Sequence, residues 1–231
     1  MARWLALIRH GDDPPDDRVV TFAVRNGFVP RILKPFRGEA LGRPDADLAG
    51  TVIYGGPFEV YREDDFPFLH DEARWIGDCM AAGVPVLGLC QGAQQIARLH
   101  GAHVGPPESG VQEFGCYRIT PTAAAGDFLT APLWAPERHF HGFDLPDGAV
   151  HLAESALYPH QAFRIGTRTY ALQFHPEVTI EGFRRWQAAA TATYGKPGVQ
   201  SPAEQDALIH AHDRAQADWF YDFLGRLFGR G

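Results

Sequence analysis

The chain has 231 residues, of which 45% are hydrophobic and 21% charged, the balance of a globular protein with a sizeable core. A net charge of −7 and the lack of any Lys- or Arg-rich run argue against a nucleic acid partner. No apolar run approaches the ~18 residues of a membrane span, and three cysteines without the spacing of a disulfide framework favour a reducing compartment, so we expect a cytoplasmic protein without a membrane partner.

Strands alternate with helices through the first hundred residues. Short apolar runs predict strands at residues 4–8, 30–36, 51–54 and 85–89. Apolar residues at helical spacing predict helices at residues 19–26, 68–82 and 91–99. This alternation is typical of βαβ units, and it predicts a parallel sheet covered by helices on both faces. Ligands of such sheets bind outside the carboxyl ends of the strands.

Shorter strand-like pieces after residue 108 predict an antiparallel portion at residues 116–120, 150–153, 161–165 and 169–174. A helix is expected at 179–190, and Ser201-Pro202-Ala203-Glu204 is a capping box that begins a last helix. We therefore predict one α/β domain over residues 1–231, with a core at about 3–190 and a helical extension at about 201–228. Its sheet is mostly parallel and flanked by helices, with a small antiparallel portion. We expect the aromatic end of the last helix to dock on this domain rather than to recruit a partner.

Cys90 lies between a predicted strand and a predicted helix, with Gly88 and Gly92 two residues away on each side. This is the layout of a nucleophile elbow with cysteine in place of serine. The sharp turn crowds the neighbouring backbone, which favours glycine at the flanking positions, and the positive end of the helix dipole favours a thiolate. A buried structural cysteine is the alternative, and the two glycines favour the nucleophile.

A thiolate nucleophile needs a base, and the base benefits from an orienting carboxylate. His175-Pro176-Glu177 follows an apolar run, so His175 is expected at a strand end with Glu177 turning back toward the imidazole. An oxyanion also needs two donors. The backbone N–H of Gln91 supplies one, and the flexible turn Gly55-Gly56-Pro57 is a candidate for the other. Taken alone, that turn is better explained as an ordinary connection.

Together, Gly88-Leu89-Cys90-Gln91-Gly92-Ala93-Gln94 and Phe174-His175-Pro176-Glu177 resemble the class I, triad-type glutamine amidotransferase family. Gly55-Gly56-Pro57 resembles that family's oxyanion loop. His141-Gly142, followed by Asp144, resembles the segment before its last strands. Glu113-Phe114-Gly115 and residues 55–75 resemble free-standing members that are similar to the amidotransferase domain of GMP synthase.

The resemblance implies Cys90 as the nucleophile, His175 as general base and acid, and Glu177 as its orienting group. It further implies an oxyanion hole at Gly56 and Gln91, and substrate contacts at Gly55, Gln94, His141 and Gly142. The implied reaction is attack on a γ-glutamyl amide such as glutamine, release of ammonia or an amine, and hydrolysis of the thioester, without a cofactor. Two positions depart from the family pattern: Gln91, which is usually hydrophobic or aromatic, and Gln112, which is often arginine.

The acceptor of the ammonia is left open by the sequence. No phosphate-cradling Walker loop is present, so a separate synthetase subunit would have to use the ammonia. The alternative is a free-standing γ-glutamyl hydrolase that acts on γ-glutamyl peptides or conjugates. A non-catalytic binding subunit is a further alternative, but the intact Cys90, His175 and Glu177 argue against it.

Histidines suggest two other functions. Arg9-His10-Gly11 resembles the signature of histidine phosphatases, which would make His10 the nucleophile, but that interpretation leaves the elbow unexplained. His139 and His141 would share a face of a strand, yet no third metal ligand is evident, and alternate residues such as His210 and His212 point apart on a helix. We therefore expect no metal.

Overall fold

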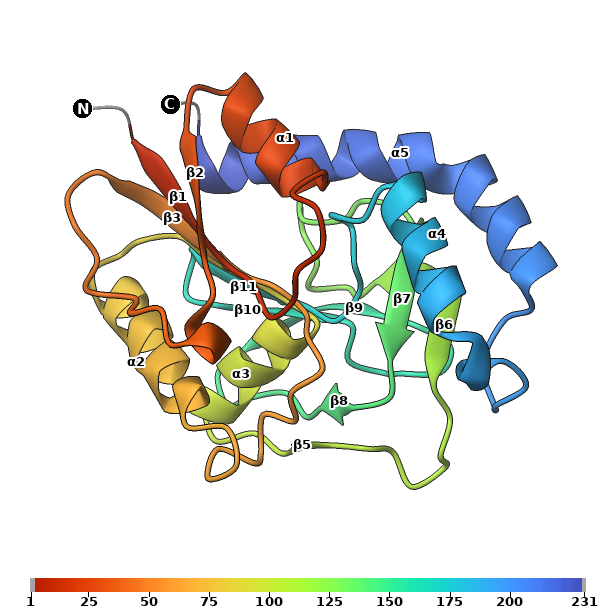
Figure 1. The fold of residues 1–231 in the computed structure, drawn as a ribbon. Helices are drawn as coiled ribbons and strands as arrows, with labels where there is room; N and C mark the ends of the chain where they lie inside the picture. The colour runs from red at the N-terminus through yellow and green to blue at the C-terminus, as the bar shows by residue number, and fades with distance from the viewer. Residues whose placement is uncertain (1–2, 230–231) are drawn as a thin grey trace.

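The computed structural model describes residues 3–229 and contains a nine-stranded sheet (Figure 1). Its order is β2-β1-β3-β4-β11-β10-β9-β6-β7. Five strands pair in parallel: β1 (Trp4–Ile8), β2 (Val29–Leu33), β3 (Leu48–Ile53), β4 (Val86–Leu89) and β11 (Thr169–Leu172). The antiparallel part continues the same sheet through β10 (Ala162–Ile165), β9 (Val150–Glu154), β6 (Glu113–Pro121) and β7 (Leu133–His139). A separate pair joins β5 (Val104–Gly105) to β8 (Gly142–Phe143).

The predicted fold class is confirmed, with local differences that have physical reasons. The strand expected at 30–36 ends at Leu33, because Pro35 begins a short 3-10 helix, η1 (Pro35–Arg37). Strand β7 was not predicted. Its inward positions alternate as a strand should, but two of them are the charged residues Glu137 and His139, so the apolar pattern is broken.

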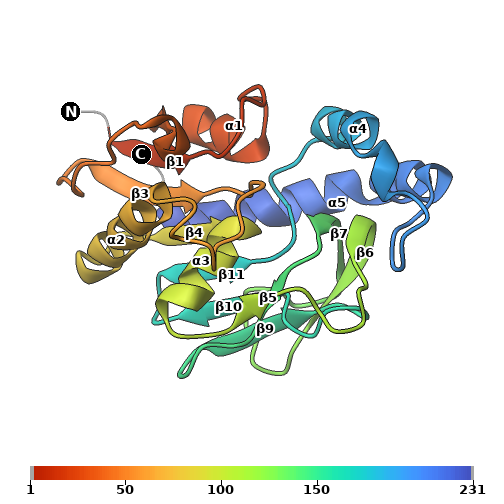
Figure 2. The same ribbon diagram turned by 60° about the horizontal axis from the view of Figure 1, so that its bottom comes forward.

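Helices cover both faces of the sheet, as Figure 2 shows: α1 (Arg18–Arg25), α2 (Phe68–Ala81), α3 (Gln91–Leu99), α4 (Ile180–Ala189) and α5 (Pro202–Phe228). Alternate side chains of β1 point to opposite faces. Leu5 and Leu7 pack in the cluster that includes α1 and α5, whereas Ala6 and Ile8 pack in the cluster that includes α2 and α3. Burial on both faces is what makes these strands near-continuous apolar runs.

The long helix α5 begins with the predicted capping box at Ser201 and Glu204. Its C-terminal part docks on the domain as expected: Phe223 lies 5.4 Å from Phe128 and 5.1 Å from Tyr170 between ring centroids. None of the helices within residues 3–229 is long and apolar enough to cross a membrane.

Candidate active site

Cys90 occupies the turn between β4 and α3 with φ 50° and ψ −105°. It is the only residue other than glycine with a positive φ in the described part of the chain. Neither flanking glycine tolerates a side chain. A Cβ on Gly88 would lie 2.5 Å from the carbonyl oxygen of Gly92, and a Cβ on Gly92 would collide with the carbonyl of Ile53. The elbow is therefore a strained turn that the surrounding backbone holds in place.

His175 follows β11 and reaches the elbow from the neighbouring strand. Its Nδ1 lies 2.8 Å from Oε1 of Glu177, and both side chains are buried. A Cβ placed on Gly55 would lie 2.8 Å from Cε1 of His175 and 3.3 Å from Cβ of Cys90. The structure therefore brings together Cys90, His175, Glu177 and the Gly55-Gly56-Pro57 loop, as the sequence predicted.

Electrostatics favour a charged imidazole at this position. Burial lowers the pKa of His175, but the Glu177 carboxylate and the Cys90 sulfur outweigh it and raise that pKa to about 10. A protonated imidazole beside a cysteine stabilises negative charge on the sulfur. Such a pair can attack a carbonyl carbon and then return a proton to a leaving amine.

The backbone around Pro176 is held by residues from two distant helices. Arg18 on α1 donates from its side chain to the carbonyls of Pro176 and Val178, and Gln216 on α5 also donates to Pro176. Arg18 in turn pairs with Asp213 on α5. These positioning residues could not be predicted, because no local pattern relates them to the His175 segment.

A second polar cluster lies beside Glu177. Arg9 pairs with Asp17, and the Tyr54 hydroxyl donates to the same carboxylate at 3.0 Å. Burial raises the pKa of Asp17, although Arg9 opposes that shift. The Arg9 charge also acts on Glu177, whose second carboxylate oxygen has no hydrogen-bond partner among the described residues.

Gln91, the residue after Cys90, connects α3 to the segment that follows β3. Its Oε1 accepts a hydrogen bond from the backbone N–H of Phe58 at 3.0 Å. A Cβ on Gly56 would lie 2.7 Å from that oxygen and would collide with the side chain of His10. The Gly55-Gly56-Pro57 loop is thus packed between His10 and Gln91. This packing explains why position 91 holds an amide and why position 56 holds glycine.

His10 is part of the framework below that loop. Its Nδ1 lies 3.1 Å from the Tyr54 carbonyl, and its Nε2 lies 2.9–3.0 Å from the Glu72 carboxylate. The side chain is fully buried, and Gln95 also donates to Glu72 at 2.6 Å. Because both ring nitrogens are engaged, this geometry argues against His10 as a phosphate-accepting nucleophile.

The predicted substrate contacts on the other side of the elbow lie together. Gln94 donates to the His141 carbonyl and to Oε1 of Gln173, both at 3.1 Å. The ring of Tyr158 packs closely over Gly142. Gln112 pairs through its backbone with Pro197. None of Gln94, His141 and Gly142 lines the cavity that contains Cys90.

That cavity has a volume of about 410 Å³ and opens beside Cys90 and His175. Its walls come from the β1–α1 loop, the oxyanion loop, β7 and α4. Arg138 on β7 and Trp186 on α4 line it opposite the β1–α1 loop, and the Trp186 ring lies 4.7 Å from that of His175. The site therefore offers much more room than a primary amide nitrogen needs.

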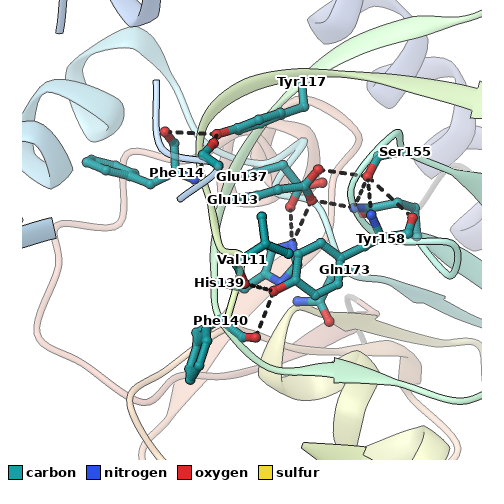
Figure 3. Close-up of polar contacts among 12 residues, drawn as sticks. Val111, Glu113, Phe114, Tyr117, Glu137, His139, Phe140, Ser155, Tyr158 and Gln173 are labelled. Atoms are coloured by element: carbon teal, nitrogen blue, oxygen red, sulfur yellow. Dashed lines mark hydrogen bonds and ion pairs between the residues drawn. The ribbon is translucent and has the colours of Figure 1, made fainter. Parts of the chain in front are cut away.

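A buried polar cluster that includes Glu113, Glu137 and His139 (Figure 3) contacts the His141 segment. The Nε2 atom of His139 lies 2.9 Å from Glu113 and 3.3 Å from Glu137, while its Nδ1 lies 3.0 Å from the His141 carbonyl. Burial and the nearby Glu113 raise the pKa of Glu137 to about 7. Burial lowers the pKa of His139, but the two carboxylates raise it well above its usual value. These three residues offer ligand atoms within 4.8 Å of one another, so the structure places two carboxylates beside His139 that the sequence pattern did not relate to it.

The family model for glutamine amidotransferase class-I matches residues 32–185. The chain belongs to the class I glutamine amidotransferase family. It is 32% identical over 203 residues to the glutamine amidotransferase-like protein YfeJ of Salmonella typhimurium, covering 80% of this chain and 82% of that protein. A glutamine amidotransferase structure from Thermotoga maritima matches with a TM-score of 0.88 and 25% identity, over 99% of each chain.

A longer relative matches over a shorter region. The GMP synthase of Porphyromonas gingivalis is 31% identical over 140 residues. The match covers 57% of this chain but only 25% of the GMP synthase. The chain therefore spans about a quarter of that relative, and most of the larger protein lies outside the shared region.

Proposed function

We propose that this protein hydrolyses a γ-glutamyl amide, with glutamine as the simplest substrate, through a Cys90–His175–Glu177 triad. The observation that carries the proposal is the strained elbow at Cys90 facing His175, whose other nitrogen is held by Glu177 at 2.8 Å. Family membership supports the same chemistry. The reaction needs no cofactor.

The proposed reaction has two steps. The Cys90 sulfur attacks the γ-carbonyl carbon, the carbon–nitrogen bond breaks, and His175 passes its proton to the leaving nitrogen. A water then attacks the γ-glutamyl thioester, His175 accepts a proton from it, and the carbon–sulfur bond breaks to release glutamate. The backbone N–H groups of Gly56 and Gln91 stabilise the oxyanion in both steps. Gly55, Gln94, His141 and Gly142 form the binding region for the glutamyl end.

Two fates of the leaving nitrogen are compatible with this chemistry. The GMP synthase match supports transfer of ammonia to a separate synthetase subunit. The roomy cavity at Cys90 supports the alternative, a free-standing γ-glutamyl peptidase whose leaving group is larger than ammonia. We further propose that the chain acts in the cytoplasm as one domain, and that residues 201–228 are a helical extension of it.

Measuring glutamate released from glutamine and from γ-glutamyl dipeptides tests the proposed function. Cys90→Ala should reduce release below a few per cent of the wild-type rate, because removing a nucleophile costs several orders of magnitude. Cys79→Ala is the matched control, since Cys79 is a buried residue of α2 that does not line the cavity. Activity that persists in Cys90→Ala would reject the triad.

A further inference from the structure

The charged groups of the cavity are mostly neutralised in pairs. These pairs are Arg9 with Asp17, Arg185 with Asp16, and His175 with Glu177. Among the described residues, neither Arg138 nor Asp13 has an ion-pair partner, although both line the cavity. Within the described part of the chain, Arg138 is the one arginine lining the cavity whose guanidinium makes no ion-pair contact, although the Asp13 carboxylate acts on its charge through space, so its donors are open to an anionic ligand.

Arg138 lies within electrostatic reach of Cys90. Its guanidinium carbon lies 5.6 Å from the centre of the Trp186 ring and 5.9 Å from that of Phe114. The same Trp186 ring contacts His175 edge-on at 4.7 Å. Both rings lie within cation–π distance of the guanidinium, and such contacts favour one position of an arginine head.

Of the four residues assigned to the glutamyl end, Gly55 lines the cavity beside Cys90 and the other three lie outside it. The cavity contains Cys90 and His175, but Gln94, His141 and Gly142 do not line it. His175 is the group that returns a proton to the leaving nitrogen. The space next to His175 and Arg138 is therefore the place of the leaving amine, and a volume of about 410 Å³ admits an amine with further atoms.

We propose that Arg138 binds a carboxylate carried by the leaving amine, so that γ-glutamyl amides of amino acids are preferred to glutamine. This inference rests on the proposed γ-glutamyl hydrolysis. In a γ-glutamyl amino acid the carboxylate is attached to the carbon next to the scissile nitrogen, and the planar guanidinium matches that carboxylate with two parallel hydrogen bonds. Hydrolysis consumes one water and releases glutamate and the free amino acid.

The test compares γ-glutamylglycine with γ-glutamylethylamide. The leaving amine of the first substrate carries a carboxylate, and that of the second carries a methyl group in its place. The wild type should turn over γ-glutamylglycine with the higher kcat/KM. Arg138→Met should reduce kcat/KM for γ-glutamylglycine by about 10- to 100-fold, the scale of a lost charged hydrogen bond, and change that for γ-glutamylethylamide by less than about twofold. Arg138→Lys should restore part of the loss. Arg118→Met, which removes an exposed arginine from the neighbouring strand β6, is the matched control and should change neither value.

Three outcomes would overturn the inference. The wild type could fail to prefer the carboxylate-bearing substrate, it could hydrolyse glutamine but no dipeptide, or Arg138→Met could weaken both substrates equally. Equal weakening would place Arg138 at the glutamyl end of the substrate instead.

A binding measurement separates this inference from the proposed function. In Cys90→Ala, calorimetry should show tighter binding of γ-glutamylglycine than of γ-glutamylethylamide, and Arg138→Met in the same background should remove the difference. Absence of that difference rejects the role of Arg138 even if hydrolysis is confirmed. Absence of hydrolysis of every γ-glutamyl amide by the wild type rejects the proposed function, whatever the binding result.

Discussion

The side-chain oxygen of Gln91 accepts a hydrogen bond from the backbone N–H of Phe58 at 3.0 Å and so ties the elbow to the oxyanion loop. In the class I glutamine amidotransferase family the position of Gln91 is usually hydrophobic or aromatic, so Gln91 departs from the family pattern. The structure gives this departure a physical function: an apolar side chain there would leave the Phe58 N–H without this partner. The loop that carries Gly56 would then lose its link to α3, whose Gln91 backbone N–H is the other proposed oxyanion donor.

Gln91→Met should therefore lower activity more than stability. We expect kcat to fall by ~10- to 100-fold, because a small displacement of an oxyanion donor is costly, with a loss of stability of about 1 kcal/mol from the unpaired N–H. Steady-state kinetics and urea unfolding measure the two effects. Gln187→Met on α4 removes a hydrogen bond to Gln205 outside the site and is the control. Similar kinetic losses in both variants would contradict the role of Gln91.

Strain at the elbow predicts a stability gain on removing the side chain of Cys90. Cys90→Gly should be inactive yet more stable than Cys90→Ala by about 1–3 kcal/mol, because glycine adopts a positive φ without a Cβ clash. Urea unfolding of the two variants measures this difference directly. Equal stability of the two would show that the turn is unstrained.

The three cysteines should differ in reactivity. Burial raises the pKa of both Cys79 and Cys116 to about 12, so these two remain thiols at neutral pH. A glutamine-derived electrophile such as a diazoketone should modify Cys90 at least about tenfold faster than either of them. Peptide mass spectrometry after timed exposure measures the three rates. Uniform labelling would argue against an activated Cys90.

The ion pair at His175 predicts a pH-dependent contribution to stability. The pKa of folded His175 is raised to about 10, above the value of ~6.5 in an unfolded chain. Its contribution is fully present below pH ~6.5 and is lost as the pH rises toward 10, because the folded state binds the extra proton in that window. Glu177→Gln should weaken this dependence, which urea unfolding at pH 6, 8 and 9.5 would measure. Glu181→Gln, an exposed change on α4, should leave it intact.

The buried carboxyl group of Glu137 predicts a second pH range, lower than that of His175, in which the stability of the fold changes. Its folded pKa of about 7 lies above the unfolded value of ~4.3, so the folded state binds more protons between these values and stability falls as the pH rises across them. Glu137→Gln cannot ionise. Its stability relative to the wild type should therefore increase from pH 5 to pH 8. A pH-independent difference in unfolding free energy would contradict a carboxyl group that titrates in this range.

Local pattern was enough to predict the elements that surround the elbow. Short apolar runs predicted β3 and β4, because strands buried on both faces rarely carry charge, and apolar residues at helical spacing predicted α3. Strand β7 could not be predicted, because the inward-facing residues Glu137 and His139 interrupt the apolar pattern of its buried face. The imidazole of His139 lies between the carboxylates of Glu137 and of Glu113 from the paired strand β6, so opposite charges compensate one another inside the protein.

The sequence by itself determined the chemistry that depends on neighbours along the chain. Cys90 between two glycines and the His175-Pro176-Glu177 segment each carry their geometry within a few residues, so the predicted triad residues could be named before the fold was known. Only the tertiary structure decided what surrounds them. Gln91 reaches Phe58, Gln216 reaches Pro176, and Arg138 faces the cavity beside Cys90, because packing brings segments far apart in the chain into contact and the sequence pattern does not record those distances.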